Sequence, residues 1–261
     1  MSKQYRPVRS VLLAILAIVS HLVPARPRMT VLVYHGITSG TDFFAVKPKE
    51  FERQLEHLTK RYTVVPLERA FRHAAGEPAT EDSVALTFDD GYKNFLTDAV
   101  PLLCAHNAPA TVFVLSGTPG AADIGNDAPL LATEDFASVA SSTIGVGSHG
   151  ETHKKLAKLS YEEALREMRD SKRVIETQYG VPVRYLAYPK GSYNAQTMQA
   201  AERAGYKGAV SVVERSVKVG DLAYALPRVQ IDASTSLADF KAKLTPAADW
   251  YYWLWSTFKR H

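Results

Sequence analysis

Val84-Ala85-Leu86-Thr87-Phe88-Asp89-Asp90-Gly91 is the stretch of sequence that decides the fold. A short apolar run that ends in turn residues predicts a buried strand, and this one delivers two carboxylates, Asp89 and Asp90, at its carboxyl end. Asp-Asp-Gly is also ordinary turn composition, so the pair alone does not establish a site. Neighbouring side chains of an extended chain point in opposite directions, so the two carboxylates can serve separate roles.

A second polar segment, Ser148-His149-Gly150-Glu151-Thr152-His153, follows another apolar run at residues 144–147. Two histidines four positions apart would lie on one face of a helical turn and could hold one ion. The zinc-protease helix has the same spacing, but it requires Glu where this chain has Gly150. One carboxylate and two imidazoles make a three-ligand metal site with an open position, and the other carboxylate remains as a base. This set of groups predicts metal-assisted hydrolysis.

Strand and helix patterns alternate along the chain, which favours a parallel sheet of βα units. The polar candidates all follow predicted strands: His35, Asp89, Asp90, His149 and Pro189. Chemistry gathered at the carboxyl ends of strands is typical of a βα barrel. We therefore expect one α/β barrel domain over residues 29–245. Strands are predicted at 29–34, 62–65, 84–88, 111–115, 144–147, 185–187, 208–212 and 226–231, with helices at 48–60, 67–74, 94–106, 160–179, 195–204 and 237–244.

The composition is that of a globular protein: 261 residues, 46% hydrophobic and 22% charged, with a net charge of +4 and a pI of about 9.0. Disordered and solenoid classes are excluded, because no low-complexity segment or repeat is present. The net positive charge suits binding to an anionic surface or polymer, or it is only solvated charge at the protein surface. The single cysteine, Cys104, excludes an internal disulfide, and we expect it to be a small core residue.

Both termini suggest a membrane-proximal protein. Lys3, Arg6 and Arg9 precede an apolar run at residues 11–23, so residues 1–28 are interpreted as a signal peptide or a membrane anchor. The body would then lie outside the cytoplasmic membrane; it would be cytoplasmic if Met29 is the true start. The tail at 246–261 is rich in Trp and Tyr and ends with basic residues. It either docks on the barrel or lies at a membrane surface.

Three motifs carry a resemblance to a known family. Thr87-Phe88-Asp89-Asp90-Gly91 is complete, the His149–His153 segment matches H-[ST]-x-x-H except at Gly150, and Tyr188-Pro189-Lys190-Gly191 matches a third motif. Over residues 30–235 the chain resembles the polysaccharide deacetylases of the NodB homology group, carbohydrate esterase family 4. The resemblance implies a distorted (β/α)7-type barrel in a single domain.

The resemblance also assigns roles. It implies that Asp89 is the general base and that Asp90, His149 and His153 hold one divalent ion, with zinc expected and cobalt, nickel or iron as alternatives. The histidine that usually supplies the general acid near the C-terminus is missing. The chain is instead similar to the permuted branch typified by poly-N-acetylglucosamine deacetylases, where the acid follows an N-terminal strand, as His35 does here.

The chain departs from the family pattern at Lys190, and the arginine beside the base has to be chosen from two candidates. Lys190 stands where Tyr is common; the oxyanion donor there is a backbone N–H, so Tyr188, Pro189 and Lys190 keep that role, but the cation would alter substrate preference. Arg228 is expected to steady the base, in preference to Arg184.

The sequence therefore predicts an N-deacetylase that releases acetate and leaves a free amino sugar. Its expected partners are an N-acetylated exopolysaccharide, a glycolipid or other lipid-linked sugar, and a membrane surface, with no nucleic acid. The alternatives are a deacylase or deformylase of a lipid-linked sugar, a non-catalytic carbohydrate-binding homologue, and an Fe(II) oxygenase, since two His and a carboxylate also suit iron.

Overall fold

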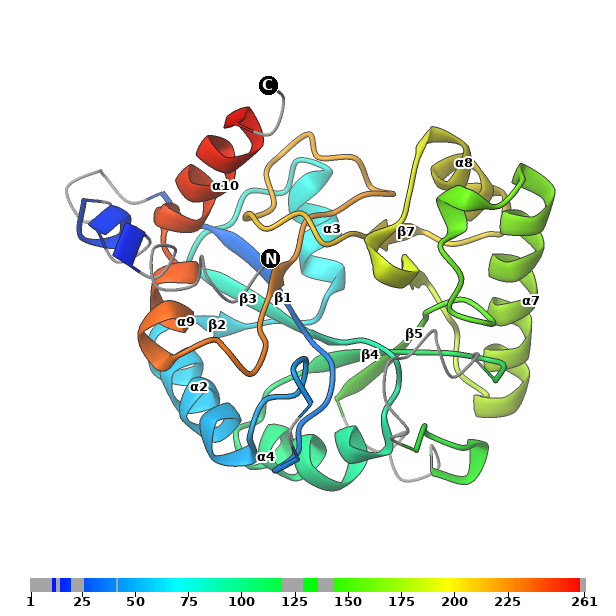
Figure 1. The fold of residues 1–261 in the computed structure, drawn as a ribbon, viewed down its shortest axis with the longest axis horizontal. Helices are drawn as coiled ribbons and strands as arrows, with labels where there is room; N and C mark the ends of the chain where they lie inside the picture. The colour runs from blue at the N-terminus through cyan, green and yellow to red at the C-terminus, as the bar shows by residue number, and fades with distance from the viewer. Residues whose placement is uncertain are drawn as a thin grey trace.

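The fold is a parallel sheet that curls into a half-barrel with helices on its outside (Figure 1). The computed structural model describes residues 11–12, 15–19, 26–40, 42–118, 129–135 and 143–258. The strand order is β7-β6-β5-β4-β3-β1-β8, and β2 pairs with the start of β3. Every ladder between these strands is parallel. The predicted single-domain α/β fold is confirmed.

The elements lie close to the predicted ranges. The strands are β1 Met29–Tyr34, β2 Thr63–Val64, β3 Ser83–Phe88, β4 Ala110–Val114, β5 Ile144–Ser148, β6 Tyr185–Ala187, β7 Gly208–Val210 and β8 Val229–Gln230. The α-helices are α2 Pro48–Arg61, α3 Glu68–Ala74, α4 Val100–Ala105, α7 Tyr161–Tyr179, α8 Ala195–Arg203, α9 Leu237–Lys243 and α10 Pro246–Phe258. Shorter turns are a π-helix at Phe95–Ala99 and 3-10 helices at Thr133–Asp135, Leu156–Lys158 and Pro189–Gly191.

Strands β1 and β3 are neighbours in the sheet, and every residue in both is buried. Such continuous burial explains why their sequences are almost uninterrupted apolar runs. They pair in parallel along their whole length, from Met29 opposite Ser83 to Tyr34 opposite Phe88. This register brings the residues that follow the two strands, His35 and Asp89, to the same edge of the sheet.

Helix α7 is fixed at both ends by its own sequence. Ser160 and Glu163 form the predicted capping box, and Gly180 ends the helix with a φ of 64°. The buried face of the helix includes Met168 and Ile175, and it packs against α8 and β5. That face also carries two polar residues, Glu167 and Ser171, which point toward the loop after β5.

The prediction that Cys104 belongs to the core is wrong, because this cysteine is exposed. A π-helical turn at Phe95–Ala99 precedes α4, and a buried stripe runs along both. That stripe runs through Phe95, Ala99 and Leu103. Cys104 comes one position after it and therefore faces solvent.

The start of the aromatic tail docks on the body. Ala247 and Ala248 in α10 are buried, and the Asp249 carboxylate accepts hydrogen bonds of 2.7 Å from both the backbone N–H and the hydroxyl of Ser216. The expected signal peptide or anchor at residues 1–28 lies mostly outside the described residues. None of the helices that the structure describes is long and apolar enough to cross a membrane.

Candidate active site and metal centre

Three buried side chains, Asp90, His149 and His153, meet at the carboxyl edge of the sheet. Asp90 follows β3, and both histidines lie in the loop after β5. One potential ligand atom from each residue lies within 4.8 Å of the other two. The Nε2 atoms of both imidazoles lie 3.4 Å from Oδ1 of Asp90. The three residues that the sequence singled out as ligands are thus brought together.

The chemistry of this cluster fits a divalent cation. Nδ1 of His149 lies 2.8 Å from the carbonyl oxygen of Ala187, so it carries the ring hydrogen and leaves the lone pair of Nε2 facing the cluster. Oδ1 of Asp90 is buried and accepts no hydrogen bond from any residue that the structure describes. A buried acceptor that faces two imidazole nitrogens is costly unless a cation satisfies it. Three N and O ligands are the set found in catalytic zinc sites.

The backbone of the His149–His153 segment differs from the prediction. The expected helical turn is wrong: the segment is a loop in which Gly150 and His153 adopt left-handed conformations, with φ of 83° and 60°. Asp90 is left-handed as well, with a φ of 70°. Asp and His tolerate this region better than most residues. Clustered left-handed residues are typical of sites where the surroundings impose the geometry.

Glu167 of α7 imposes that geometry, and the sequence did not reveal it. Its buried carboxylate accepts hydrogen bonds from the backbone N–H groups of Glu151 (3.2 Å) and Thr152 (3.1 Å) and from the Thr152 hydroxyl (2.6 Å). Ser171, one turn further along α7, contacts Ser148 through their hydroxyls at 2.8 Å. The loop between the two histidines is therefore held by α7. The sequence signal that could have revealed these contacts is the pair Glu167 and Ser171, two polar residues four positions apart on an otherwise apolar face of the helix.

Asp89 does not join the cluster but pairs with Arg228. The guanidinium donates two hydrogen bonds of 2.7 Å, one to each carboxylate oxygen. It also donates to Thr87 Oγ1 at 3.0 Å and to the Ser211 carbonyl at 2.9 Å. Arg228 is fully buried, and Asp89 is 3% exposed. Arg184 instead lies 3.7 Å from Glu68, so Arg228 is the arginine in contact with Asp89.

This pairing decides the charge of Asp89. Burial alone would raise the pKa of the carboxyl group, but Arg228, with smaller contributions from His149 and His35, outweighs burial and lowers the pKa below its ordinary value. Asp89 is therefore ionised at neutral pH. Each of its oxygens accepts one hydrogen bond from Arg228 and keeps further acceptor capacity.

His35 lies at the same edge, directly after β1. Its imidazole contributes to lowering the pKa of Asp89, after the larger contributions of Arg228 and His149, and the pKa of Asp90, after the larger contribution of His149. Its Nδ1 is buried and has no hydrogen-bond partner among the described residues. The ring of Phe44 lies 5.2 Å from the His35 ring, and it is 45% exposed. An aromatic surface thus adjoins His35.

The third motif forms the neighbouring rim. The Tyr188 hydroxyl donates to the Tyr224 carbonyl at 2.9 Å and anchors the motif. A Cβ atom built on Gly150 would lie 3.5 Å from Pro189, so this motif adjoins the loop that carries the histidines. Lys190 is exposed and left-handed, with a φ of 57°.

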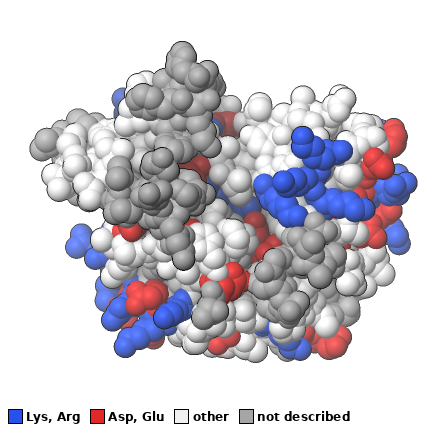
Figure 2. All heavy atoms as spheres, in the orientation of Figure 1, with Lys and Arg blue, Asp and Glu red and all other residues white. Residues whose placement is uncertain are grey.

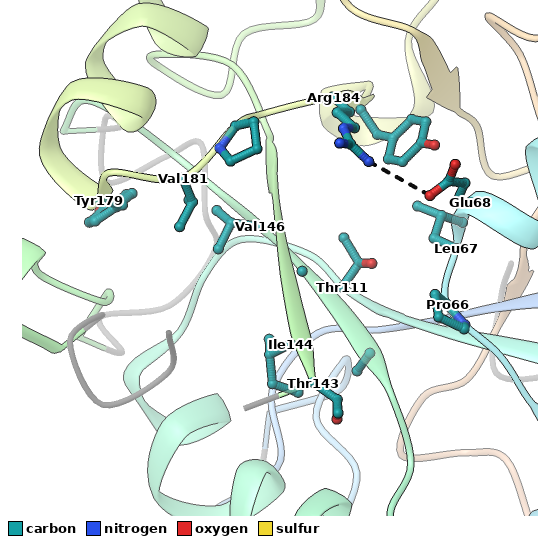
Figure 3. Close-up of a pocket in the computed structure, with 14 residues that line it drawn as sticks. Pro66, Leu67, Glu68, Thr111, Thr143, Ile144, Val146, Tyr179, Val181 and Arg184 are labelled. Atoms are coloured by element: carbon teal, nitrogen blue, oxygen red, sulfur yellow. Dashed lines mark ion pairs between the residues drawn. The ribbon is translucent and has the colours of Figure 1, made fainter. Parts of the chain in front are cut away.

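A separate cavity of ≈ 340 Å³ lies at the opposite edge of the sheet (Figure 3). It is lined by the first residues of three strands, among them Thr111 of β4 and Ile144 of β5. The ion pair between Arg184 and Glu68 lies at one side of it. None of the predicted site residues lines this cavity.

Comparison with known proteins agrees with the motifs. The sequence profile described as polysaccharide deacetylase matches residues 76–209. The chain belongs to the polysaccharide deacetylase family. It is 30% identical over 217 residues to YxkH of Bacillus subtilis, whose name assigns it to the polysaccharide deacetylases, and the match covers 82% of this chain and 75% of YxkH.

Two further proteins are similar to this polysaccharide deacetylase. The solved structure of the Streptococcus pyogenes deacetylase PplD in complex with acetate has 26% identity and a TM-score of 0.74, covering 85% of this chain and 100% of PplD. The poly-beta-1,6-N-acetyl-D-glucosamine N-deacetylase of Staphylococcus aureus is 22% identical over 201 residues, which are 72% of this chain and 68% of that protein.

Proposed function

We propose that this polysaccharide deacetylase is a metal-dependent hydrolase that removes N-acetyl groups from a glycan. The products would be acetate and a free amino sugar. The observation that carries the proposal is the arrangement of a buried Asp90–His149–His153 cluster beside an ionised Asp89. The name of the Staphylococcus aureus relative supports an N-acetylated amino sugar as the reacting unit. We also propose that the body acts outside the cytoplasmic membrane.

The chain's own groups have separate roles in this proposal. A divalent ion held by Asp90, His149 and His153 would polarise the amide carbonyl and acidify a water molecule. Asp89 accepts the proton of the attacking water on a carboxylate oxygen, while Arg228 holds that carboxylate in place. His35, as the imidazolium, donates a proton to the departing nitrogen. The backbone N–H of Lys190 stabilises the oxyanion.

Acetate release from N-acetylated oligosaccharides tests the proposal. The purified protein is assayed on chitooligosaccharides with added zinc, cobalt or nickel, and wild type is compared with Asp89→Asn. Loss of the base should lower kcat by about 10²–10⁴-fold. Zinc affinity, measured by competition with a chelating dye, serves as the control and should be retained.

Three other outcomes would contradict the proposal. Sugar binding without acetate release across a panel of N-acetylated glycans would indicate a non-catalytic homologue. Release of formate, or activity confined to lipid-linked sugars, would indicate the alternative deacylase. Turnover that requires 2-oxoglutarate and O₂ would indicate an iron oxygenase.

A further inference from the structure

Four exposed lysines lie beside the candidate site. Lys154, Lys155 and Lys158 follow His153, and Lys190 follows Pro189 in the third motif. We call these four residues the lysine rim. Figure 2 shows a dense patch of Lys and Arg on one face of the molecule, in the region where Figure 1 places β7 and the start of α7.

The two loops that carry the lysine rim are tied together. Nδ1 of His149 lies 2.8 Å from the Ala187 carbonyl, and Asn194 donates to the Ala157 carbonyl at 3.5 Å. Lys155 is the N-cap of the 3-10 helix at Leu156–Lys158 and Lys158 is its last residue, so their Cα atoms are about 6 Å apart along the helix axis. The four cations therefore share one surface, and that surface begins at a metal ligand.

Nearby acidic groups pair with only part of the lysine rim. Lys154 lies 3.7 Å from Glu167, which also accepts three hydrogen bonds from the histidine loop. Glu163 is occupied by the capping box with Ser160. Within the part of the chain that the structure describes, no acidic group lies within ion-pair distance of Lys155 or Lys158. Lys155 and Lys158 thus contribute positive charge to the surface next to the site.

We propose that the lysine rim binds anionic groups of the substrate, so that the acetylated glycan carries carboxylate or phosphate groups close to the reacting sugar. This inference rests on the proposed function and names its substrate class. Exposed cations near a binding site attract anions and repel cations. Each deacetylation adds one ammonium to the polymer, so a neutral glycan becomes a polycation that the rim repels. A glycan with fixed anions remains attracted after several turnovers.

Kinetics on matched oligosaccharides test this inference. Acetate release is measured on three N-acetylated oligosaccharides of equal length: neutral chitohexaose, an oligomer alternating with uronic acid, and an oligomer joined by phosphodiesters. The two anionic substrates distinguish carboxylate from phosphate recognition. Wild type should have a kcat/KM at least tenfold higher on one of them than on chitohexaose. Raising NaCl from 50 to 500 mM should reduce this preference, because salt screens exposed charges.

The Lys155→Glu/Lys158→Glu variant tests whether these two lysines bind the anionic groups of the substrate. Its preference for the anionic over the neutral substrate should fall about 25-fold, mainly through KM, since one exposed charge pair contributes up to about fivefold. The matched control is Lys60→Glu/Lys207→Glu, which changes the net charge equally at exposed sites before β2 and β7. This control should keep the wild-type preference.

Several results would overturn the inference while leaving the proposed function intact. These are equal kcat/KM on neutral and anionic substrates, an equal loss on all three in the rim variant, or a rim variant that loses only its binding to phosphatidylserine vesicles. If no substrate releases acetate, the proposed function fails. Calorimetric binding of the same oligosaccharides then decides the inference: tighter binding of an anionic one that the rim variant loses supports it, and equal binding contradicts it.

Discussion

The Asp89–Arg228 pair joins two residues that lie far apart in the sequence and are both almost fully buried. Such a pair adds little net stability by itself, because two charges must be removed from water. The pair instead fixes the positions of the two side chains. Four hydrogen bonds hold the Arg228 guanidinium, and the guanidinium in turn holds the Asp89 carboxylate. Thr87 in turn donates to the Leu32 carbonyl at 2.7 Å, which links the pair to strand β1.

Replacing only one member of this pair should strongly destabilise the fold. Arg228→Met leaves a buried carboxylate without compensation, and we expect the free energy of unfolding to fall by about 3–5 kcal/mol. Asp89→Asn/Arg228→Met removes both charges of the pair and should recover at least half of that loss. Urea unfolding of the two variants and wild type measures the difference. Equal stability of the single and double variants would contradict the role assigned to the pair.

Glu167 offers a test of how the histidine loop is held. Groups that orient metal ligands typically contribute 10–100-fold to metal affinity, and Glu167→Ala should weaken zinc binding within that range. Competition with a chelating dye measures the affinity, and circular dichroism checks that α7 remains folded. Glu162→Ala, an exposed change in the first turn of the same helix, is the matched control and should bind zinc as wild type does.

The residues of the candidate site show what the sequence could predict and what it could not. Asp90, His149 and His153, which the structure brings together, could be singled out from the sequence because they follow apolar strands and match motifs. Their backbone was not predictable from spacing: four positions suggested a helical turn, and the chain forms a left-handed loop. Glu167 was missed because the polar pair on the apolar face of α7 does not show which loop it contacts, and the partners of Glu167 are mostly backbone N–H groups.

The strands were predicted better than the turns between them. Buried strands such as β3 are continuous apolar runs, and the capping box of α7 depends only on neighbouring residues. Cys104 follows Leu102 and Leu103, and of these three residues only Leu103 is buried, so the apolar run does not show which face of α4 packs inward. Local rules therefore predicted these elements, whereas the rotation of α4 required the packed structure.

Strand β5 contains a glycine that packing requires. A Cβ atom on Gly147 would lie 2.4 Å from the Phe113 ring, and that ring lies 5.6 Å below the guanidinium of Arg228. Gly147→Ala should therefore cost about 1–3 kcal/mol of unfolding free energy and lower kcat by displacing the arginine that holds Asp89. Gly40→Ala, in a loop with no contact closer than 3.6 Å, should change neither quantity in urea unfolding or acetate release.

The whole molecule separates its candidate site from the cavity beside the Arg184–Glu68 ion pair. Most of the predicted site residues follow the carboxyl ends of β1, β3, β5 and β6, whereas the cavity lies at the start of β4, β5 and β6. The alternation of strands and helices predicted this architecture from the sequence. The strand order, with β8 beside β1, was not predictable because that pairing joins distant segments.

Metal binding should stabilise the whole fold because the ligands come from distant segments. His149 follows Asp90 by about sixty residues, so the unfolded chain holds no comparable site. Zinc at 100 times its Kd should add about 2.7 kcal/mol of stability. For a domain of this size that raises Tm by roughly 5–10 °C. Differential scanning calorimetry with zinc, with magnesium and with a chelator added after zinc measures the shift.

The comparison with His153→Ala locates the binding responsible for that shift. This variant keeps two of the three ligands and loses the one that the loop holds in a left-handed conformation. Its Tm should rise with zinc by less than half of the wild-type shift, and magnesium should leave wild type unchanged because that ion prefers oxygen ligands. An equal zinc shift in both proteins would place the binding at other His or Cys side chains. The Asp90–His149–His153 cluster would then lose its role as the metal centre.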